Sequence, residues 1–410
     1  MKKYKRLFFA AILLAMAQFS IAQELFSPAY PAPKYEVRGV WLTTLGGLDW
    51  PRIKATSATK REQQKQELCQ ILDQLKAAKI NTVFMQTRIR GAVIYPSKIE
   101  PWDVCLTGQY DKDPGYDPLA FAIEETHKRG MELHAWVVTV PSFKIKDAAK
   151  LGSKSLLKTH PELLKKHNDM YYLDPGLPGS DDYLVGICKE IVSRYDVDGI
   201  HFDDYFYPAL GSKYETMFDA QEYEAYKKKR KAAGKKVLSI DKWRMYNVNT
   251  LVKEVYSAIK ETRSDCIFGI SPGGYIDYFD DKDRWYVDYR TWMKEDGYVD
   301  YICPQLYWSF NNRNIFPFYD TLLAWAENLQ NENVKLYVGL PAYKMNERNV
   351  ISSQDSLVDT EWYNQYLLAD MVRFLRRSGK ASGFIVFDYS DLVTSKNAKA
   401  AQYMKEEIEG

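Results

Sequence analysis

The sequence has few cysteines and almost no net charge. The five cysteines are far apart, with no Cys-x-x-Cys pair and no spacing typical of a zinc site, at positions 69, 105, 188, 266 and 303. We therefore expect them to be small buried hydrophobic residues, with one disulfide bond as the less favoured alternative. The 56 basic and 54 acidic residues leave a net charge of +2, so the overall charge does not favour a nucleic-acid partner.

Several motifs that mark cofactor-dependent enzymes and other hydrolases are also missing. The sequence contains no GxGxxG turn after its first strand, no Walker phosphate loop, no serine nucleophile elbow and no zinc-binding helix motif. The acidic stretch at 280–283 could contact a cation, but it lacks the pattern of a calcium-binding loop. The sequence therefore predicts neither a cofactor nor a metal site.

A long hydrophobic run occurs only at the N-terminus. Basic residues precede an apolar stretch at 7–17, and Ser20 and Ala22 supply small side chains before a cleavage point. This pattern is typical of a secretory signal peptide over residues 1–22, because the stretch is shorter than the roughly 20 residues that span a bilayer. A retained anchor is the alternative. We expect an exported protein, periplasmic or secreted, with no membrane-spanning segment after residue 22.

The remaining chain alternates short apolar runs with amphipathic segments. One such segment places Leu68, Ile71, Leu72 and Leu75 on one helical face. Eight apolar runs read as strands, at 37–42, 82–86, 131–138, 199–202, 266–271, 301–305, 336–340 and 383–387. This count predicts an α/β fold, a (β/α)8 TIM barrel formed by residues 23–410 as one domain, with long loops after strands 3 and 4. An open doubly wound sheet is the competing fold, but it usually has fewer strands.

The sharpest candidate for chemistry is the acid pair Asp203 and Asp204, directly after the fourth strand. Active sites of such barrels lie at the carboxyl ends of the strands. Two adjacent carboxyl groups cannot both ionise at low cost, so one should have a raised pKa and serve as a proton donor to a glycosidic oxygen. The alternative is that one aspartate caps the next turn or forms an ion pair with Arg38 or Arg88.

Polar and aromatic residues follow most of the other predicted strands. The aromatic content is 14%, and aromatic faces can stack on the C–H faces of pyranose rings. We therefore expect a polysaccharide partner. The predicted substrate-binding residues are Arg38, Trp41, Gln86, Arg88, Trp136, Tyr205, Tyr275, Asp288, Gln305, Tyr307, Trp308, Tyr343 and Asp388.

Two mechanisms are compatible with the acid pair. In the first, a second carboxylate from Asp277, Asp288 or Asp388 completes a standard two-carboxylate glycosidase. In the second, a 2-acetamido group of the substrate is the nucleophile, with Asp203 orienting the acetamido nitrogen and Asp204 acting as acid and then base. The adjacent acids resemble the arrangement in substrate-assisted N-acetylglucosaminidase barrels.

Two further features have ordinary structural explanations. His134 and His201 lie on predicted strands, where a histidine is more often a buried core residue than a ligand. The basic run at 227–231 is typical of a solvated helix face, with contact to an anionic polymer as the alternative.

Four stretches carry a family resemblance: 36–42, 171–176, 195–208 and 300–308, of which the Asp-Asp-Tyr-Phe-Tyr-Pro segment at 203–208 is the most specific. Over residues 35–345 the sequence resembles glycosyl-hydrolase-like family 10, a group of exported bacterial barrel proteins. Asp203 and Asp204 match the acidic pair of the family. Gln305 and Tyr307 match its Pro-Gln-x-Tyr-Trp segment, and Asp288 matches an acidic position in its Tyr-x-Asp-x-Arg-x-Trp segment.

The resemblance implies a (β/α)8 barrel that acts on glycans, and some members cleave peptidoglycan strands already stripped of their peptides. The sequence departs from the common family pattern at 91–92, 138–141 and 275–276, where members often have Gly-Asp, Asn-Pro-Tyr-Arg and Trp-Arg. We predict a glycoside hydrolase acting on a glycan that contains 2-acetamido sugars, with peptide-free peptidoglycan as the expected substrate. Hydrolysis of another polysaccharide and a non-catalytic sugar-binding barrel are the alternatives.

Overall fold

The structure is a computed structural model, and it describes residues 34–210, 218–276, 285–311, 317–352 and 357–410. The predicted signal peptide, the acidic stretch at 280–283 and Asp277 lie outside the described residues. All five cysteines are described: four are buried, as expected for small hydrophobic side chains, whereas Cys69 is half-buried. No described helix combines the length and the apolar character needed to cross a membrane.

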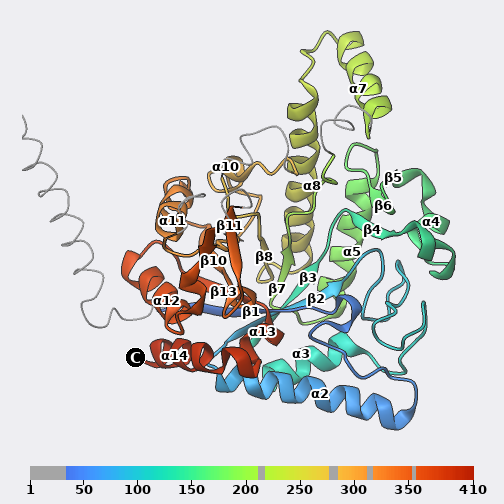
Figure 1. The fold of residues 1–410 in the computed structure, drawn as a ribbon. Helices are drawn as coiled ribbons and strands as arrows, with labels where there is room; N and C mark the ends of the chain where they lie inside the picture. The colour runs from blue at the N-terminus through green and yellow to red at the C-terminus, as the bar shows by residue number, and fades with distance from the viewer. Residues whose placement is uncertain (1–33, 211–217, 277–284, 312–316, 353–356) are drawn as a thin grey trace, which may run out of the picture.

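Eight parallel strands close into a barrel in the order in which they occur along the chain (Figure 1). They are β1 (Val37–Leu42), β2 (Thr82–Arg88), β3 (Glu132–Val137), β7 (Gly199–Phe202), β8 (Ile267–Ile270), β9 (Tyr301–Ile302), β10 (Lys335–Pro341) and β13 (Gly383–Phe387). The first and last strands pair, with Val37 opposite Gly383, so no edge is left open. The predicted TIM barrel is confirmed, and each strand overlaps one of the eight apolar runs.

Helices surround the barrel and bury one face against it. Ser57 caps the N-terminus of α2 by accepting a hydrogen bond from the backbone N–H of Lys60, and the predicted apolar face of α2 is buried. The surrounding helices are α2 (Ala58–Ala77), α3 (Pro118–Lys128), α5 (Ser180–Arg194), α8 (Ile240–Thr262), α11 (Phe318–Glu327), α12 (Leu367–Ser378) and α14 (Ala398–Glu409). Between β8 and β9 the described residues form the single helical turn α10 (Tyr289–Trp292).

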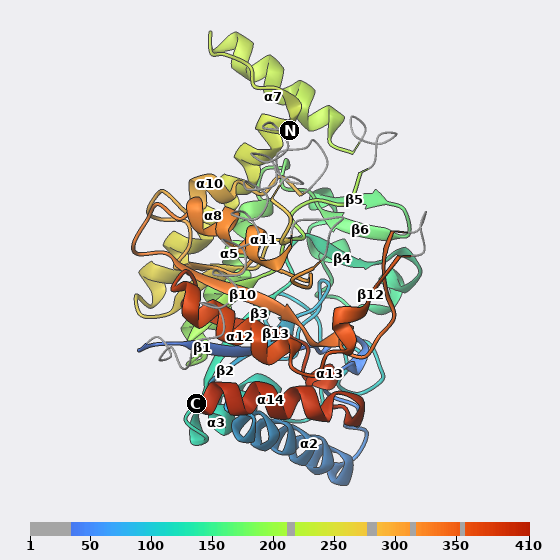
Figure 2. The ribbon, with the colours of Figure 1, turned by 60° about the vertical axis from the view of Figure 1, so that its left-hand side comes forward.

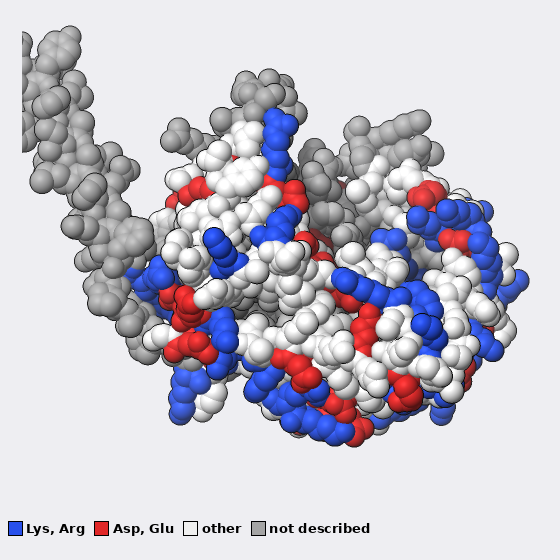
Figure 3. All heavy atoms as spheres, turned by 60° about the horizontal axis from the view of Figure 1, so that its bottom comes forward, with Lys and Arg blue, Asp and Glu red and all other residues white. Residues whose placement is uncertain are grey.

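The long loops predicted after strands 3 and 4 are present and carry their own structure. The loop after β3 holds a three-stranded antiparallel sheet of β4 (Pro141–Lys144), β5 (Leu164–His167) and β6 (Met170–Leu173). The excursion after β7 holds α7 (Ala220–Ala232), which buries none of its side chains and stands away from the barrel in Figures 1 and 2. The basic run therefore lies on a solvated helix. Basic and acidic residues are interspersed on the face drawn in Figure 3.

The interior of the barrel is a packed aromatic core and not a pore. A hydrogen-bond chain crosses it: Trp41 Nε1 donates to His201 Nε2 at 3.0 Å, and the hydroxyl of Tyr301 bridges the Nδ1 atoms of His201 and His134 at 2.9 and 3.2 Å. Burial lowers the pKa of His134 to about 3 and that of His201 well below its ordinary value, so both rings are neutral. These two histidines are core residues, and His201 also forms part of the cavity floor described below.

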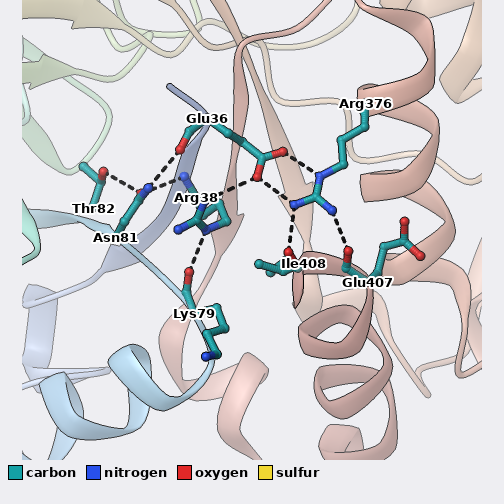
Figure 4. Close-up of polar contacts among 8 residues, drawn as sticks. All are labelled: Glu36, Arg38, Lys79, Asn81, Thr82, Arg376, Glu407 and Ile408. Carbon is teal, nitrogen blue, oxygen red and sulfur yellow. Dashed lines mark hydrogen bonds and ion pairs between the residues drawn. The ribbon is translucent and has the colours of Figure 1, made fainter. Parts of the chain in front are cut away.

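A buried ion pair joins the first strand to the C-terminal helices at the amino-terminal end of the barrel (Figure 4). The guanidinium of Arg376 on α12 donates to both carboxylate oxygens of Glu36 at 2.9 Å. Arg376 also donates to the carbonyl oxygens of Glu407 and Ile408 near the end of α14. Because the pair is bidentate and both side chains are almost fully buried, it fixes the C-terminal helices against the start of β1.

Candidate active site

A cavity of about 550 Å³ opens at the carboxyl ends of the barrel strands. Its volume lies within the range typical of small-molecule sites. Its walls combine side chains from strand ends with residues of the loop after β3. It is lined by Trp41, Thr43, Leu45, Leu48, Gln86, Arg90, Trp136, Val138, Pro141, Met170, Tyr172, His201, Asp203, Tyr205, Tyr207, Pro208, Ala209, Ser271, Trp285, Gln305, Tyr307, Tyr343 and Phe387.

Asp203 faces this cavity because of the alternation of β7. Ile200 and Phe202 pack into the core between strands and helices, so His201 and Asp203 point to the other side, toward the barrel interior. Asp203 is 4% exposed. Its Oδ2 accepts a hydrogen bond from Trp136 Nε1 at 3.0 Å, and its Oδ1 accepts one from the backbone N–H of Tyr205 at 3.4 Å. Burial, reinforced by the charge of Asp204, raises the pKa of Asp203 to about 7.

Asp204 is buried beside Asp203 but does not line the cavity. Burial raises its pKa to about 7, and hydrogen bonds from its own backbone N–H and from that of Gly273 oppose the rise. The charge of Asp204 contributes to the raised pKa of Tyr205, so the Asp204 carboxyl group lies near this cavity residue. Neither aspartate forms an ion pair with a described residue, so the alternative pairing with Arg38 or Arg88 is wrong. Both carboxyl groups are thus buried side by side, and their raised pKa values favour retention of one proton by the pair near neutral pH.

Five of the predicted aromatic residues line the cavity. Trp41 and Trp136 form its deeper part, whereas Tyr205 and Tyr343 are exposed near its mouth. The rings of Tyr307 and Tyr343 meet edge to face with centroids 5.7 Å apart. Aromatic surfaces at two depths, beside a proton-donating carboxyl, form an arrangement that can hold consecutive sugar rings.

Two predicted amide side chains reach the cavity and are held in place by backbone groups. Oε1 of Gln86 accepts hydrogen bonds from the backbone N–H groups of Thr44 and Leu45 at 3.0 and 2.8 Å. Nε2 of Gln305 donates to the carbonyl oxygen of Ser271 at 3.2 Å. Each amide therefore has one end fixed, which orients its other end for a ligand.

Neither predicted arginine lines the cavity. Arg38 lies at the opposite end of the barrel, where its Nε donates to the carbonyl oxygen of Lys79 at 2.8 Å and Nη1 contacts Glu36 (Figure 4). Arg88 is fully buried and forms a bidentate ion pair with Glu100 at 2.8 and 2.7 Å. Both predictions are corrected for the same reason: each guanidinium is already occupied by partners within the protein.

Four other predicted binding residues also lie outside the cavity lining. Asp288 caps α10 by accepting hydrogen bonds from Thr291, and Asp388 caps the short helix α13 (Tyr389–Val393). Burial and the nearby charge of Asp49 raise the pKa of Asp388 to about 7. The same carboxyl group accepts a hydrogen bond from the backbone N–H of Asp391 in α13. The remaining two, Tyr275 and Trp308, contact each other with ring centroids 6.3 Å apart.

Several residues that line the cavity were not predicted from the strand ends. Met170 and Tyr172 come from β6 in the loop after β3, and Trp285 precedes α10. Arg90 lies two residues after Arg88, the last residue of β2. The segment containing Tyr172 was recognised in the family resemblance, but nothing local indicates that the loop folds back over the cavity.

The described residues contain no group of three or more His, Cys, Asp or Glu side chains suited to a metal ion. The chemistry available from the described lining residues is therefore that of a protonated carboxyl group, neutral hydrogen-bonding groups, one guanidinium and aromatic surfaces.

Comparisons with known proteins agree with this geometry. A family model described as glycosyl hydrolase-like 10 matches residues 36–357. The glycosyl hydrolase YngK of Bacillus subtilis (strain 168) is 39% identical over 327 residues, which cover 76% of this chain and 61% of YngK. The chain thus spans less than two thirds of that relative. The glycosyl hydrolase DigH of Escherichia coli (strain K12) is 32% identical over 399 residues, covering 90% of this chain and 86% of DigH.

The fold also matches solved structures of carbohydrate-active barrels. The catalytic domain of β-amylase from Paenibacillus polymyxa superposes with a TM-score of 0.54 and 12% sequence identity, covering 92% of this chain and all of that domain. At this identity the likeness concerns the fold alone.

Proposed function

Because this chain belongs to the glycosyl hydrolase-like 10 family, we propose that it is a glycoside hydrolase that cleaves a glycan built from 2-acetamido sugars. We propose peptide-free peptidoglycan strands as the substrate and an exported location, periplasmic or secreted, as the place of action. The observation that carries the proposal is Asp203, a carboxyl group that faces a sugar-sized cavity and retains its proton near pH 7.

The number of carboxyl groups in the cavity favours a 2-acetamido sugar as the substrate. A two-carboxylate glycosidase places its second carboxyl group roughly 5–5.5 Å or 6.5–9.5 Å from the first. Among the described residues that line the cavity, Asp203 is the single Asp or Glu, and both Asp288 and Asp388 cap helices. A substrate that carries an acetamido group brings its own nucleophile, so the reaction needs no second carboxylate in that position.

We assign Asp203 as general acid and then general base. Its proton passes to the glycosidic oxygen as the C1–O bond breaks, while the acetamido oxygen of the substrate bonds to C1 and forms an oxazolinium ring. The Asp203 carboxylate then takes a proton from water, the water oxygen bonds to C1, and the ring reopens with the anomeric configuration retained. These proposed roles differ from the substrate-assisted mechanism suggested by the sequence, in which Asp204 is the acid.

In this assignment Asp204 is a positioning residue that acts through charge. Two backbone N–H groups favour its ionised form, and its negative charge helps to keep the proton on Asp203. The charge of Asp204 thus favours the protonated form of Asp203, which donates the proton.

Asp204→Asn is expected to move the pH profile of kcat/KM. In the wild type the alkaline limb should fall near pH 7, where Asp203 loses its proton. Removing the neighbouring negative charge lowers the pKa of Asp203, so the limb should move to lower pH by about one unit, equivalent to about 1.4 kcal/mol of lost repulsion. Asp196→Asn, which removes an exposed carboxylate, is the control. An unchanged or upward-shifted limb would contradict the assignment.

The substrate is tested by digesting purified peptidoglycan, intact and after amidase treatment, alongside a panel of other polysaccharides. We expect mass analysis to reveal glycan fragments from the amidase-treated polymer. Release of fragments from another polysaccharide and none from peptidoglycan would reject the proposed substrate and retain the enzyme class.

A further inference from the structure

Arg90 is a cation in the cavity wall that the proposed reaction does not use. It is half-buried and lines the cavity together with Tyr172 and Tyr205. Its positive charge is close enough to both phenols to oppose the rise that burial causes in their pKa values. Among the described residues that line the cavity, it is the single Lys or Arg. No carboxylate of a described residue forms an ion pair with it, so its charge is not neutralised by the described part of the protein.

Arg88, two residues earlier, differs from Arg90 because its charge is neutralised by a buried ion pair with Glu100. Its guanidinium donates hydrogen bonds to Glu100 and to the carbonyl oxygens of Val138 and Thr139. Arg90 has the same N–H donors as Arg88, but it is only half-buried and lines the cavity. A guanidinium presents a planar fork of N–H groups that matches a carboxylate in a bidentate fashion. The guanidinium of Arg90 is therefore suited to bind an anionic group of the substrate in the cavity.

We propose that Arg90 binds the lactyl carboxylate of a muramic acid residue and thereby makes the enzyme prefer strands without peptides. This inference rests on the proposed function. In intact peptidoglycan the lactyl group is amide-linked to the stem peptide and carries no charge, whereas amidase cleavage frees the carboxylate. Arg90 thus distinguishes the two polymers by charge as well as by bulk.

The rest of the cavity is compatible with an anionic substrate. Asp203 is protonated over part of the neutral range and then does not repel a carboxylate. Arg90 lies with Tyr172 of β6 and Tyr205, so the carboxylate would be held between aromatic side chains from two different loops. Partial exclusion of water in such a place strengthens the contact relative to one on an open surface.

The test separates charge from size. Glycan strands from amidase-treated peptidoglycan are compared with the same strands after their lactyl carboxylates are converted to methylamides, which are neutral and small. For the full-length wild type, kcat/KM should be roughly 10- to 100-fold higher on the carboxylate form, the range expected for a charged hydrogen-bonded contact. Arg90→Gln should lose this preference and cleave both forms at similar rates.

Matched variants and a binding measurement complete the test. Arg52→Gln removes an exposed cation outside the cavity lining and should keep the preference, and Arg90→Lys should keep part of it. If Arg90→Gln does not fold, the wild-type preference should still shrink when salt rises from about 50 to about 500 mM, because screening weakens a partly exposed ion pair. Affinity for both strand forms is measured with Asp203→Asn.

The outcomes distinguish this inference from the proposed function. Equal cleavage and equal binding of both forms by the wild type would overturn the role of Arg90 and leave the proposed function in place. Tighter binding of the carboxylate form that depends on Arg90, without cleavage of either form, would support Arg90 and reject the hydrolysis. Faster cleavage of hyaluronan, whose carboxylate belongs to a uronic acid, would overturn the assignment to a lactyl group.

Discussion

Asp203→Asn is expected to lower kcat by about 10²- to 10⁴-fold, the contribution typical of a positioned general acid. Asparagine keeps the size of the side chain and can still accept the hydrogen bond from Trp136 Nε1, but it has no proton to give to the glycosidic oxygen. The affinity for the glycan should change little, because the loss concerns the transition state. Single-turnover assays with amidase-treated peptidoglycan, together with a binding measurement, check both statements.

The stability of this variant provides the control. The folded protein holds Asp203 with a raised pKa, so at pH 8 its ionised carboxylate opposes folding relative to the unfolded chain, where its pKa is lower. Asparagine removes that unfavourable charge, and Asp203→Asn should therefore unfold no earlier than the wild type at pH 8. A substrate with an activated leaving group, which needs no protonation, should recover much of its cleavage. Wild-type rates in Asp203→Asn on the natural glycan would refute the proposed acid.

Glu100→Gln is expected to lower the free energy of unfolding by about 3–5 kcal/mol, as is typical when one partner of a buried ion pair is removed. Glu100 and Arg88 are both fully buried, and Tyr183 on α5 also donates to Glu100 at 2.9 Å. A neutral amide leaves the charge of Arg88 uncompensated at a fully buried position. Chemical denaturation of the variant and the wild type at the same pH measures the difference.

A surface ion pair is the matched control for Glu100. Glu62→Gln breaks the pair with Lys65, in which Glu62 is 61% exposed, and should change the free energy of unfolding by less than about 1 kcal/mol. A change of similar size in both variants would show that Glu100 has no special role. Because Arg88 also holds the carbonyl oxygens of Val138 and Thr139, Glu100→Gln should disturb the cavity wall and reduce activity even where the protein remains folded.

The barrel could be predicted because its strands alternate strictly with helices and each strand carries its own apolar run. The period of two explains the direction of each side chain within a strand. On β1, Val40 and Leu42 pack outward against the helices while Trp41 points into the barrel interior. The same alternation placed Asp203 at the cavity. These features depend on the local backbone and need no knowledge of distant segments.

The cavity wall could be predicted only in part because loops complete it. Arg38 precedes the middle of its strand and lies at the wrong end of the barrel, and Asp288 and Asp388 satisfy the N-termini of the helices that follow them. Tyr172 reaches the cavity because β6 pairs with β4 and β5 in a small sheet outside the barrel. The identity of each residue was visible in the sequence, but its partner was not.

By itself the sequence determined the eight-stranded barrel and the place of the acid pair at its carboxyl-terminal end, since both follow from periodicity along the chain. Tertiary structure decided which of two arginines two residues apart is available to a ligand. Arg88 meets Glu100 and is neutralised, whereas Arg90 meets no described carboxylate and remains charged toward the cavity. The difference arises because an ion pair depends on where a distant carboxylate comes to lie after folding, which no local pattern specifies.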